Sequence, residues 1–329
     1  MKREIQRRAE TPQQPRIFVQ IASYRDPDCQ WTIKDLFEKA LHPERIFVGV
    51  TWQFVEKEDR GCFVEPYRYP EQVRVHVSDA RESKGTCWAR SVGQRLWRGE
   101  EFALQIDSHM RFEPGWDEKL LSVWARCKNE KAVVTGYMPG FTPPDTFQRE
   151  WIFGMSATEF DEDGILRFSG APAWRTGGGE PSHPVPGAFV SGNMLFGPAS
   201  MIRDVPYDPN LYFFGEEVSL AVRLWTHGYD IYHPNQLLMF HNWSREARRT
   251  HFDDHAWEER HRKAVKRVRQ MLLVGEDGSG KPMGRYGLGT ARTLGEYQRY
   301  SGVDFGTMSF SARAAKCNYI LARHSRSAS

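Results

Sequence analysis

The chain has 329 residues, 40% of them hydrophobic, which is enough for one large domain or two modest ones. Its formal net charge of +3 is too balanced to indicate a nucleic-acid-binding protein, although it is compatible with an anionic small ligand. The five cysteines are widely spaced and form no Cys-X-X-Cys pair, so neither a disulfide framework nor a zinc ribbon is indicated. No segment approaches the ~18–20 apolar residues that cross a bilayer. We therefore expect a cytoplasmic protein without a transmembrane segment.

The first third of the chain alternates between strand and helix patterns, after a charged, Gln- and Pro-rich start that predicts a disordered tail over residues 1–14. Strands are predicted at residues 17–22, 45–52, 73–77 and 102–107, and helices at 31–41 and 86–97. This alternation predicts an α/β domain with a largely parallel sheet. In such sheets, ligands bind beyond the carboxyl ends of the strands.

The rest of the chain is less regular. A stretch rich in Gly and Pro, residues 168–187, predicts a mobile flap or a substrate loop. Further strands are predicted at residues 188–196, 229–232 and 237–240, and helices at 218–226 and 257–273, the second of which is basic and amphipathic. Residues 275–289 are rich in glycine and predict a linker, which a last small helical piece follows.

The most informative motif is the end of the strand at residues 102–107, where Asp107 is followed by His109. Residues i and i+2 of a strand point to the same face, so the two side chains can converge on one ion. A carboxylate with an imidazole suits Mn²⁺ or a similar divalent cation, and such an ion at a strand end can hold a diphosphate. An ordinary polar turn is the alternative, and it is the better interpretation of an isolated Asp-X-His.

Five signatures, in this order along the chain, favour the metal site over the ordinary polar turn. They are Ser23-Tyr24-Arg25-Asp26 after the first strand, Ala89-Arg90 with Leu96-Trp97-Arg98-Gly99-Glu100, Gln105-Ile106-Asp107-Ser108-His109 with Trp116-Asp117, Phe214-Gly215-Glu216-Glu217, and Phe240-His241-Asn242-Trp243. Together they resemble the GlcNAc-transferase family whose eukaryotic members modify hydroxyproline, and more distantly the polypeptide GalNAc-transferases. The resemblance covers roughly residues 15–245.

The resemblance implies an α/β GT-A fold, with a Rossmann-like mixed sheet flanked by helices. It also implies a UDP-sugar donor, dependence on Mn²⁺ or another divalent cation, and retention of anomeric configuration. We accordingly divide the chain into the tail 1–14, a GT-A catalytic domain 15–245, and a helical C-terminal extension 246–329 with a Gly-rich linker. The predicted reaction moves GlcNAc from UDP-GlcNAc to a hydroxyl group of a protein or glycan acceptor.

Asp107 and His109 would supply two metal ligands, and His241, at the end of another predicted strand, would supply the third. A lone His241 is more often structural, but the resemblance reverses that preference. Tyr24 and Arg25 close the first strand, where uracil or ribose would dock, and Arg25 could reach a carbonyl or phosphate group. A polar loop in which Arg25 pairs with Asp26 is equally consistent with the sequence.

Other candidates lie at predicted helix starts. Lys84 precedes a helix that contains Arg90, so backbone N–H groups and positive charge there could hold phosphate. The resemblance implies that Glu216, with Glu217 second, contacts the donor sugar or the acceptor hydroxyl, although carboxylates also stabilise a helix start. The predicted catalytic residues are thus Glu216 and Glu217, and the donor-binding residues are Ser23, Tyr24, Arg25, Asp79, Arg81, Lys84, Arg90, Asp107, Ser108, Gly192 and Asn193.

Three other functions compete with this prediction. A different UDP-sugar donor, such as UDP-GalNAc or UDP-Gal, is compatible with the motifs because a few pocket residues set sugar specificity. A nucleotide- or glycan-binding module that has lost catalysis is the second alternative, and the presence of Asp107, His109 and Glu216 argues against it. A metal-dependent hydrolase would need a second cluster of carboxylates and histidines. His251 and His255 are interpreted as part of a solvated, charged surface.

Overall fold

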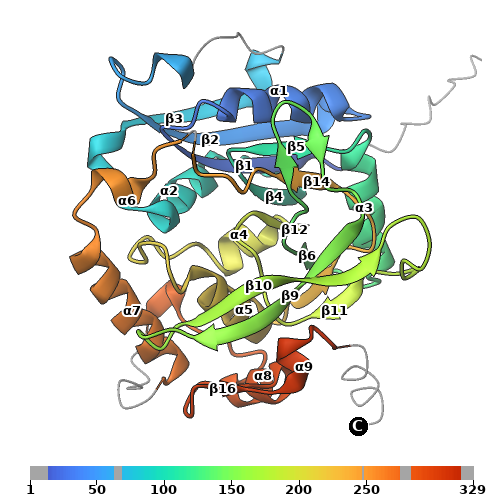
Figure 1. Ribbon diagram of the computed structural model, residues 1–329, viewed down its shortest axis with the longest axis vertical. Helices are drawn as coiled ribbons and strands as arrows, with labels where there is room; N and C mark the ends of the chain where they lie inside the picture. The colour runs from blue at the N-terminus through green and yellow to red at the C-terminus, as the bar shows by residue number, and fades with distance from the viewer. Residues whose placement is uncertain (1–13, 63–68, 247, 275–282, 320–329) are drawn as a thin grey trace, which may run out of the picture.

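The computed structural model describes residues 14–62, 69–246, 248–274 and 283–319 (Figure 1). Its centre is an eight-stranded mixed sheet with the strand order β11-β13-β6-β12-β4-β1-β2-β3. The strands are β1 (Ile17–Tyr24), β2 (Ile46–Phe54), β3 (Val73–Asp79), β4 (Phe102–Asp107), β6 (Ala132–Thr135), β11 (Val185–Gly187), β12 (Met194–Pro198) and β13 (Asp230–His233). The strands β4-β1-β2-β3 are parallel, and β12 runs antiparallel between β4 and β6.

The two faces of this sheet bury two separate clusters of apolar side chains. Ile17, Val19 and Ile21 of β1 point to one face and pack in the cluster that contains residues of α1 (Cys29–Lys39) and α3 (Trp116–Arg126). Phe18 points to the other face and belongs to the cluster with residues of α2 (Thr86–Gly93) and α5 (Glu216–Thr226). The alternation of side chains along a strand produces this division, and it leaves the strand ends free to carry polar groups.

Helices and short strands of the C-terminal third pack on the same face as α5. The elements are α6 (His251–Asp254), α7 (Glu258–Leu272), α8 (Leu294–Ser301), β15 (Val303–Asp304), β16 (Ser309–Phe310) and α9 (Ala312–Ala315). Val268, Tyr297 and Phe305 are buried in one cluster with residues of α5, so the described part of the predicted extension shares a core with the sheet domain. The domain boundary at residue 245 stays a prediction.

A long two-stranded ribbon crosses the molecule beside the sheet (Figure 1). It consists of β9 (Trp151–Phe160) and β10 (Leu166–Arg175) and follows the short strands β7 (Phe141–Thr142) and β8 (Thr146–Phe147). The prediction of a flap or loop over residues 168–187 was therefore wrong for its first part, and it was also wrong for its last three residues, which form β11. β10 tolerates its Gly and Pro because it has β9 on one side only and because its register with β9 shifts next to Pro172.

The other predicted elements agree with the structure to within a few residues, with two further exceptions. The predicted helix 86–97 ends at Gly93 and continues as a 3₁₀ turn, and the strand predicted from residue 188 begins only at Met194. The disordered tail, most of the linker from residue 275 and the chain beyond residue 319 lie outside the described residues. In the described ranges, no helix combines the length and apolar character that a membrane span requires.

The buried carboxylate of Asp117 should contribute strongly to stability. Its oxygens accept hydrogen bonds from the backbone N–H groups of Leu41 and His42 and from Arg45, at 2.7–3.0 Å. We expect Asp117→Ala to lower the free energy of unfolding, measured in urea, by about 3–5 kcal/mol. Glu118→Ala is the matched control, since exposed Glu118 contacts the same Arg45, and it should cost at most about 1 kcal/mol. Equal losses from the two variants would contradict this account.

Candidate active site

A cavity of about 370 Å³ opens at the carboxyl ends of β1 and β4. Polar and charged residues from β1, α2, β4, α5 and the segment around His241 line it. The predicted site residues among them are Tyr24, Arg90, Asp107, Ser108, His109, Gly192, Asn193, Glu216, Glu217 and His241. The cavity therefore collects most of the site residues predicted from the sequence, although they are spread over more than 200 positions of the chain.

Asp107, His109 and His241 meet at the bottom of this site. One ligand atom from each lies within 4.8 Å of the others, and Oδ2 of Asp107 lies 3.2 Å from Nε2 of His241. The pairing of two short strands explains why His241 arrives here. β14 (Met239–His241) runs antiparallel to β5 (Met110–Phe112), which directly follows His109, so His241 pairs with Met110.

A buried carboxylate orients His109. Oδ2 of Asp26 lies 2.7 Å from Nδ1 of His109 and accepts a hydrogen bond from the hydroxyl of Ser108 at 2.6 Å. Although burial alone would raise the pKa of Asp26, the hydrogen bond with His109 holds that pKa below its usual value. Because Nδ1 of His109 contacts Asp26, Nε2 is the ring nitrogen that stays available to a metal ion, as in many metal-ligating histidines. The sequence analysis missed this role, because it considered Asp26 only as a partner of Arg25.

The chemistry of the three residues fits a divalent cation such as Mn²⁺. Burial lowers the pKa of His241 to about 4, so its imidazole is neutral, the form that binds metal. Its Nδ1 is buried and has no hydrogen-bond partner among the described residues. Burial opposes ionisation of Asp107, but the hydrogen bond with His241 and the charge of Arg90 keep its pKa well below the usual range.

The guanidinium group of Arg90 connects the triad to α5. It donates to Oε1 of Glu216 at 2.5 Å, to Oδ1 of Asp107 at 3.0 Å and to the carbonyl oxygen of Gly192 at 2.8 Å. The thiol of Cys87 donates to the other oxygen of Glu216 at 3.1 Å. Arg90 is 3% exposed, so it positions both carboxylates from inside the protein.

The neighbouring carboxylate of Glu217 has a different environment. It accepts hydrogen bonds from the backbone N–H of Gly192 at 2.8 Å and from the hydroxyl of Tyr137 at 3.4 Å. Burial and the nearby charge of Glu216 raise the pKa of Glu217 to about 7. Two adjacent carboxylates of one helix start thus differ, since Glu216 is ion-paired with Arg90 whereas Glu217 holds a proton at mildly acidic pH.

Gly192 and Asn193 form part of the cavity wall. A Cβ atom on Gly192 would lie 2.7 Å from Oε1 of Glu216 and 2.9 Å from Nη1 of Arg90, so only glycine lets these two side chains come so close. Asn193 is buried at 4% exposure and lines the cavity, and neither its amide nitrogen nor its amide oxygen has a hydrogen-bond partner in the described structure. An unpaired buried amide offers two donors and an acceptor to a ligand.

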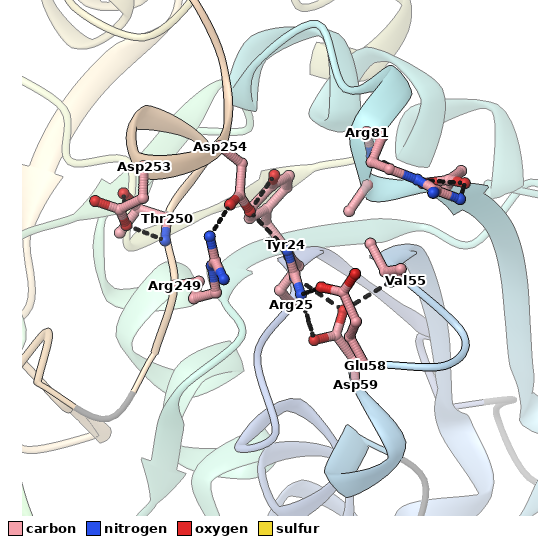
Figure 2. Close-up of polar contacts among 12 residues, drawn as sticks. Tyr24, Arg25, Val55, Glu58, Asp59, Arg81, Arg249, Thr250, Asp253 and Asp254 are labelled. Atoms are coloured by element: carbon pink, nitrogen blue, oxygen red, sulfur yellow. Dashed lines mark hydrogen bonds and ion pairs between the residues drawn. The ribbon is translucent and has the colours of Figure 1, made fainter.

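The described lining of the cavity does not include five predicted donor-binding residues, namely Ser23, Arg25, Asp79, Arg81 and Lys84. Figure 2 shows that the guanidinium of Arg25 contacts Glu58 at 2.5 Å, Asp59 at 2.9 Å and Asp254 at 3.0 Å. Among the described residues, Arg25 thus has three carboxylate partners, none of which is the Asp26 considered from the sequence.

Three of the other four members of this group have local partners. Asp79 and Arg81 form an exposed ion pair with each other, and Lys84 lies over the ring of Trp88. Their donor-binding roles stay predictions.

The segment after β14 folds back across the cavity and supplies residues that the sequence analysis missed. Arg245, Arg248 and Arg249 line the cavity there. The interpretation of His251 as a surface residue was wrong, because it is 7% exposed and its ring nitrogens contact the hydroxyls of Tyr212 and Thr86 at 2.9 and 3.1 Å. The sequence signal for this part of the site was a cluster of arginines followed by an aromatic residue. From sequence alone, such a cluster looks like a solvated surface.

Comparisons with known proteins place this site in context. A family model described as "Glycosyltransferase (GlcNAc)" matches residues 16–70 and 60–307. No curated protein sequence matches the chain significantly. Among solved structures, GalNAc-T7 with UDP, GalNAc and Mn²⁺ matches 88% of the chain at 13% identity with a TM-score of 0.58, and TarS 1–349 of S. aureus with UDP-GlcNAc matches 78% at 12% identity with a TM-score of 0.47.

The chain spans 55% of that GalNAc-T7 chain and 66% of that TarS chain. The likeness to GalNAc-T7 concerns the fold alone, and it confirms the GT-A fold expected from the sequence, with its mixed sheet flanked by helices.

The raised pKa of Glu217 predicts a pH-dependent contribution to stability. Because its pKa of about 7 in the folded protein exceeds the ordinary 4.5, the folded protein binds a proton that the unfolded chain has lost, and stability falls as the pH rises between these values. Glu217→Gln removes this effect. We measure the free energy of unfolding in urea for the variant and the wild type. The value for the variant minus the value for the wild type should be about 2 kcal/mol larger at pH 8 than at pH 5.

The control is Glu159→Gln, an exposed position on β9, which should follow the wild type at both pH values. If the curves of Glu217→Gln and the wild type stayed parallel, the carboxyl group of Glu217 would be ionised across the whole range.

Proposed function

We propose that this chain, which belongs to the GlcNAc glycosyltransferase family, transfers GlcNAc from UDP-GlcNAc to a hydroxyl acceptor with the help of a divalent cation. The observation that carries the proposal is the convergence of Asp107, His109 and His241 in the cavity at the strand ends. The GalNAc-T7 structure of the same fold contains UDP, GalNAc and Mn²⁺, which is the combination of ligands that we expect here with GlcNAc as the sugar.

We assign the cation to Asp107, His109 and His241, with Asp26 orienting His109. A bound divalent cation would neutralise the charge that the departing diphosphate gains in the transition state. The chain adds positive charge of its own, because Arg245, Arg248 and Arg249 line the same cavity. Their guanidinium groups suit phosphate oxygens.

The uracil end of the donor is assigned to Tyr24, which lines the cavity and is held in place by the hydrogen bond from its hydroxyl to Asp254 at 2.9 Å. The sugar end is assigned to Asn193 and Glu216. Asn193 has unpaired amide groups for sugar hydroxyls, and Glu216 is fixed by Arg90 at the start of α5.

We propose transfer with retention of configuration. Two routes give retention, namely a covalent intermediate on a carboxylate, or transfer on one face of the sugar in which the departing phosphate takes the acceptor proton. Glu216 suits the first route poorly, because both of its oxygens accept hydrogen bonds and Arg90 neutralises its charge. We therefore favour the second route, with Glu217 as a hydrogen-bond partner of the acceptor hydroxyl.

Metal dependence and donor choice are tested together by UDP release from UDP-GlcNAc, UDP-GalNAc and UDP-Gal with Mn²⁺ or with EDTA. We expect release from UDP-GlcNAc with Mn²⁺ only. Asp107→Asn should lower the rate by about 100-fold or more, because the cation contributes several kcal/mol to transition-state stabilisation.

Asp145→Asn, at an exposed position of the β7–β8 loop, should behave as the wild type. Release that persists in EDTA or in Asp107→Asn would contradict the assignment of the cation, and a preference for another UDP-sugar would contradict the donor.

The stereochemical proposal has its own test. GlcNAc is α-linked in UDP-GlcNAc, so a retaining enzyme yields an α-linked product. We expect the anomeric proton of the first product, observed by NMR during the reaction, to have the small coupling constant of an α-glycoside. A large coupling in the first product formed would mean inversion, and Glu217 would then be the candidate general base.

A further inference from the structure

A second hollow adjoins the cavity, and we call it the annex. It has a volume of about 350 Å³, and its walls include Tyr137, Phe153, Phe168 and Trp243. Tyr137, Phe168 and Trp243 also line the proposed donor cavity. The two spaces are therefore contiguous, with these three aromatic side chains at their junction.

The annex differs from the donor cavity in charge. The donor cavity contains several arginines and carboxylates, among them Arg90, Asp107 and Arg245. None of the described residues that line the annex is an arginine, lysine, histidine or carboxylate, and its polar side chains include the amide of Gln148 and the hydroxyl of Ser169. A phosphate or carboxylate would lose its hydration there without gaining an ion-pair partner, so the annex suits a neutral ligand.

Two aromatic rings form a fixed corner of the annex. The rings of Trp243 and Tyr137 lie 5.5 Å apart at an angle of 69°. Each is anchored at its polar edge, since the indole N–H of Trp243 donates to the carbonyl oxygen of Met138 at 3.2 Å and the hydroxyl of Tyr137 donates to Glu217 at 3.4 Å. Trp243 nevertheless remains 48% exposed, so a large apolar ring face is available at low entropic cost.

This corner lies next to the proposed reaction centre. The ring of Trp243 contacts that of His241, with 4.1 Å between the ring centroids, and Tyr137 contacts Glu217 through its hydroxyl. A ligand resting on Trp243 would therefore place a hydroxyl group near both the metal triad and Glu217. An acceptor needs that position if it is to reach the donor sugar.

We propose that the annex is the acceptor subsite and that the acceptor is a neutral sugar, whose apolar C–H face rests on Trp243 and whose hydroxyl points toward Glu217. This proposal rests on the glycosyltransferase function proposed above. In the transfer, the acceptor O–H bond and the bond between C1 of GlcNAc and the phosphate oxygen break. The bond between the acceptor oxygen and C1 forms, the proton passes to the departing phosphate, and UDP leaves.

The size and chemistry of the annex favour a sugar over a peptide. Its volume is near the lower end of the ~300–1,000 Å³ typical of ligand pockets, which fits one or two compact rings better than an extended chain. The neutral groups of Gln148 and Ser169 match sugar hydroxyls, which both donate and accept hydrogen bonds. A hydroxyproline peptide is the competing acceptor.

The test fills the annex with a bulky side chain. Ser169 is exposed on β10 and lines only the annex, so Ser169→Trp should fold normally and block the subsite. Thr158→Trp is the matched control, since Thr158 is an exposed hydroxyl-bearing residue of the paired strand β9 and lies in neither lining. The probes are the methyl glycosides of glucose, galactose, mannose and GlcNAc, the methyl glycoside of glucuronic acid, and a hydroxyproline peptide.

Two readouts are measured for the wild type and both variants. The first is the binding of each probe in the presence of UDP and Mn²⁺, by saturation-transfer NMR. The second is UDP release from UDP-GlcNAc with and without the probe. We expect at least one neutral glycoside to bind and to accelerate release, and Ser169→Trp to raise its KM by about 10-fold or more. Release without acceptor and UDP affinity should stay at the wild-type level in Ser169→Trp.

The outcomes separate this inference from the proposed function. Preference for the glucuronide or the peptide, no binding of any neutral glycoside, or equal use of a neutral glycoside by wild type and Ser169→Trp would each overturn the acceptor subsite, even with normal UDP release. Failure of the wild type to bind UDP or to turn over UDP-GlcNAc would overturn the proposed function instead. With UDP-GlcNAc turnover intact, binding of a neutral glycoside that Ser169→Trp abolishes and Thr158→Trp preserves would support the annex as the acceptor subsite.

Discussion

The site depends on one buried guanidinium group. Arg90 is almost completely enclosed, and a buried charge is tolerated only where opposite charges and hydrogen bonds compensate its lost hydration. Glu216 and Asp107 provide the charges, and the carbonyl of Gly192 provides a further acceptor. The two carboxylates depend on Arg90 in turn, because a positive group between two carboxylates in one cavity favours the ionised form of both. Arg90 therefore connects Asp107 of the proposed metal site with Glu216 of α5.

The same group explains why Glu216 and Glu217 differ. Glu216 forms an ion pair with Arg90, whereas Glu217 contacts a backbone N–H and a tyrosine hydroxyl, and burial raises the pKa of Glu217 to about 7. Carboxylates held in different environments are suited to different roles in one reaction. In the proposed mechanism Glu216 is a fixed contact for the donor, and Glu217 lies between the donor cavity and the annex.

Local pattern was enough to predict the parts of the site that depend on strand geometry. The spacing of Asp107 and His109 after a buried strand predicted that their side chains converge, and they do, although His109 lies in a bend after β4 ends at Asp107. The order of the motifs added His241 and Glu216. Most strands of the central sheet followed from the alternation of apolar runs and helical patterns, although β6 and β11 were not predicted, and the GT-A fold followed from the family resemblance. What these predictions lacked was the partner of each polar group.

Those partners come from distant parts of the chain. Asp26 orients His109 from 83 positions away, and His251 reaches Thr86 from 165 positions away. Neither contact has a periodic or local signature, so both required the fold. The same holds for β10, whose glycines and prolines predict a loop and which is a strand only because β9 pairs with it along its length.

The segment after β14 is held in place by residues at the end of β1. Asp254 accepts hydrogen bonds from Tyr24 and Arg25 at 2.9 and 3.0 Å and also pairs with Arg249 (Figure 2). These contacts hold the arginine-rich segment across the cavity and leave Tyr24 at its wall. Arg25, whose charge is already balanced by carboxylates, thus helps to shape the proposed donor cavity without lining it. The arginines of the segment line that cavity where we propose that a diphosphate binds, while Trp243, a few residues earlier, also lines the uncharged annex. One stretch of chain therefore contributes to both spaces. It supplies arginines to the cavity and an uncharged aromatic ring to the annex.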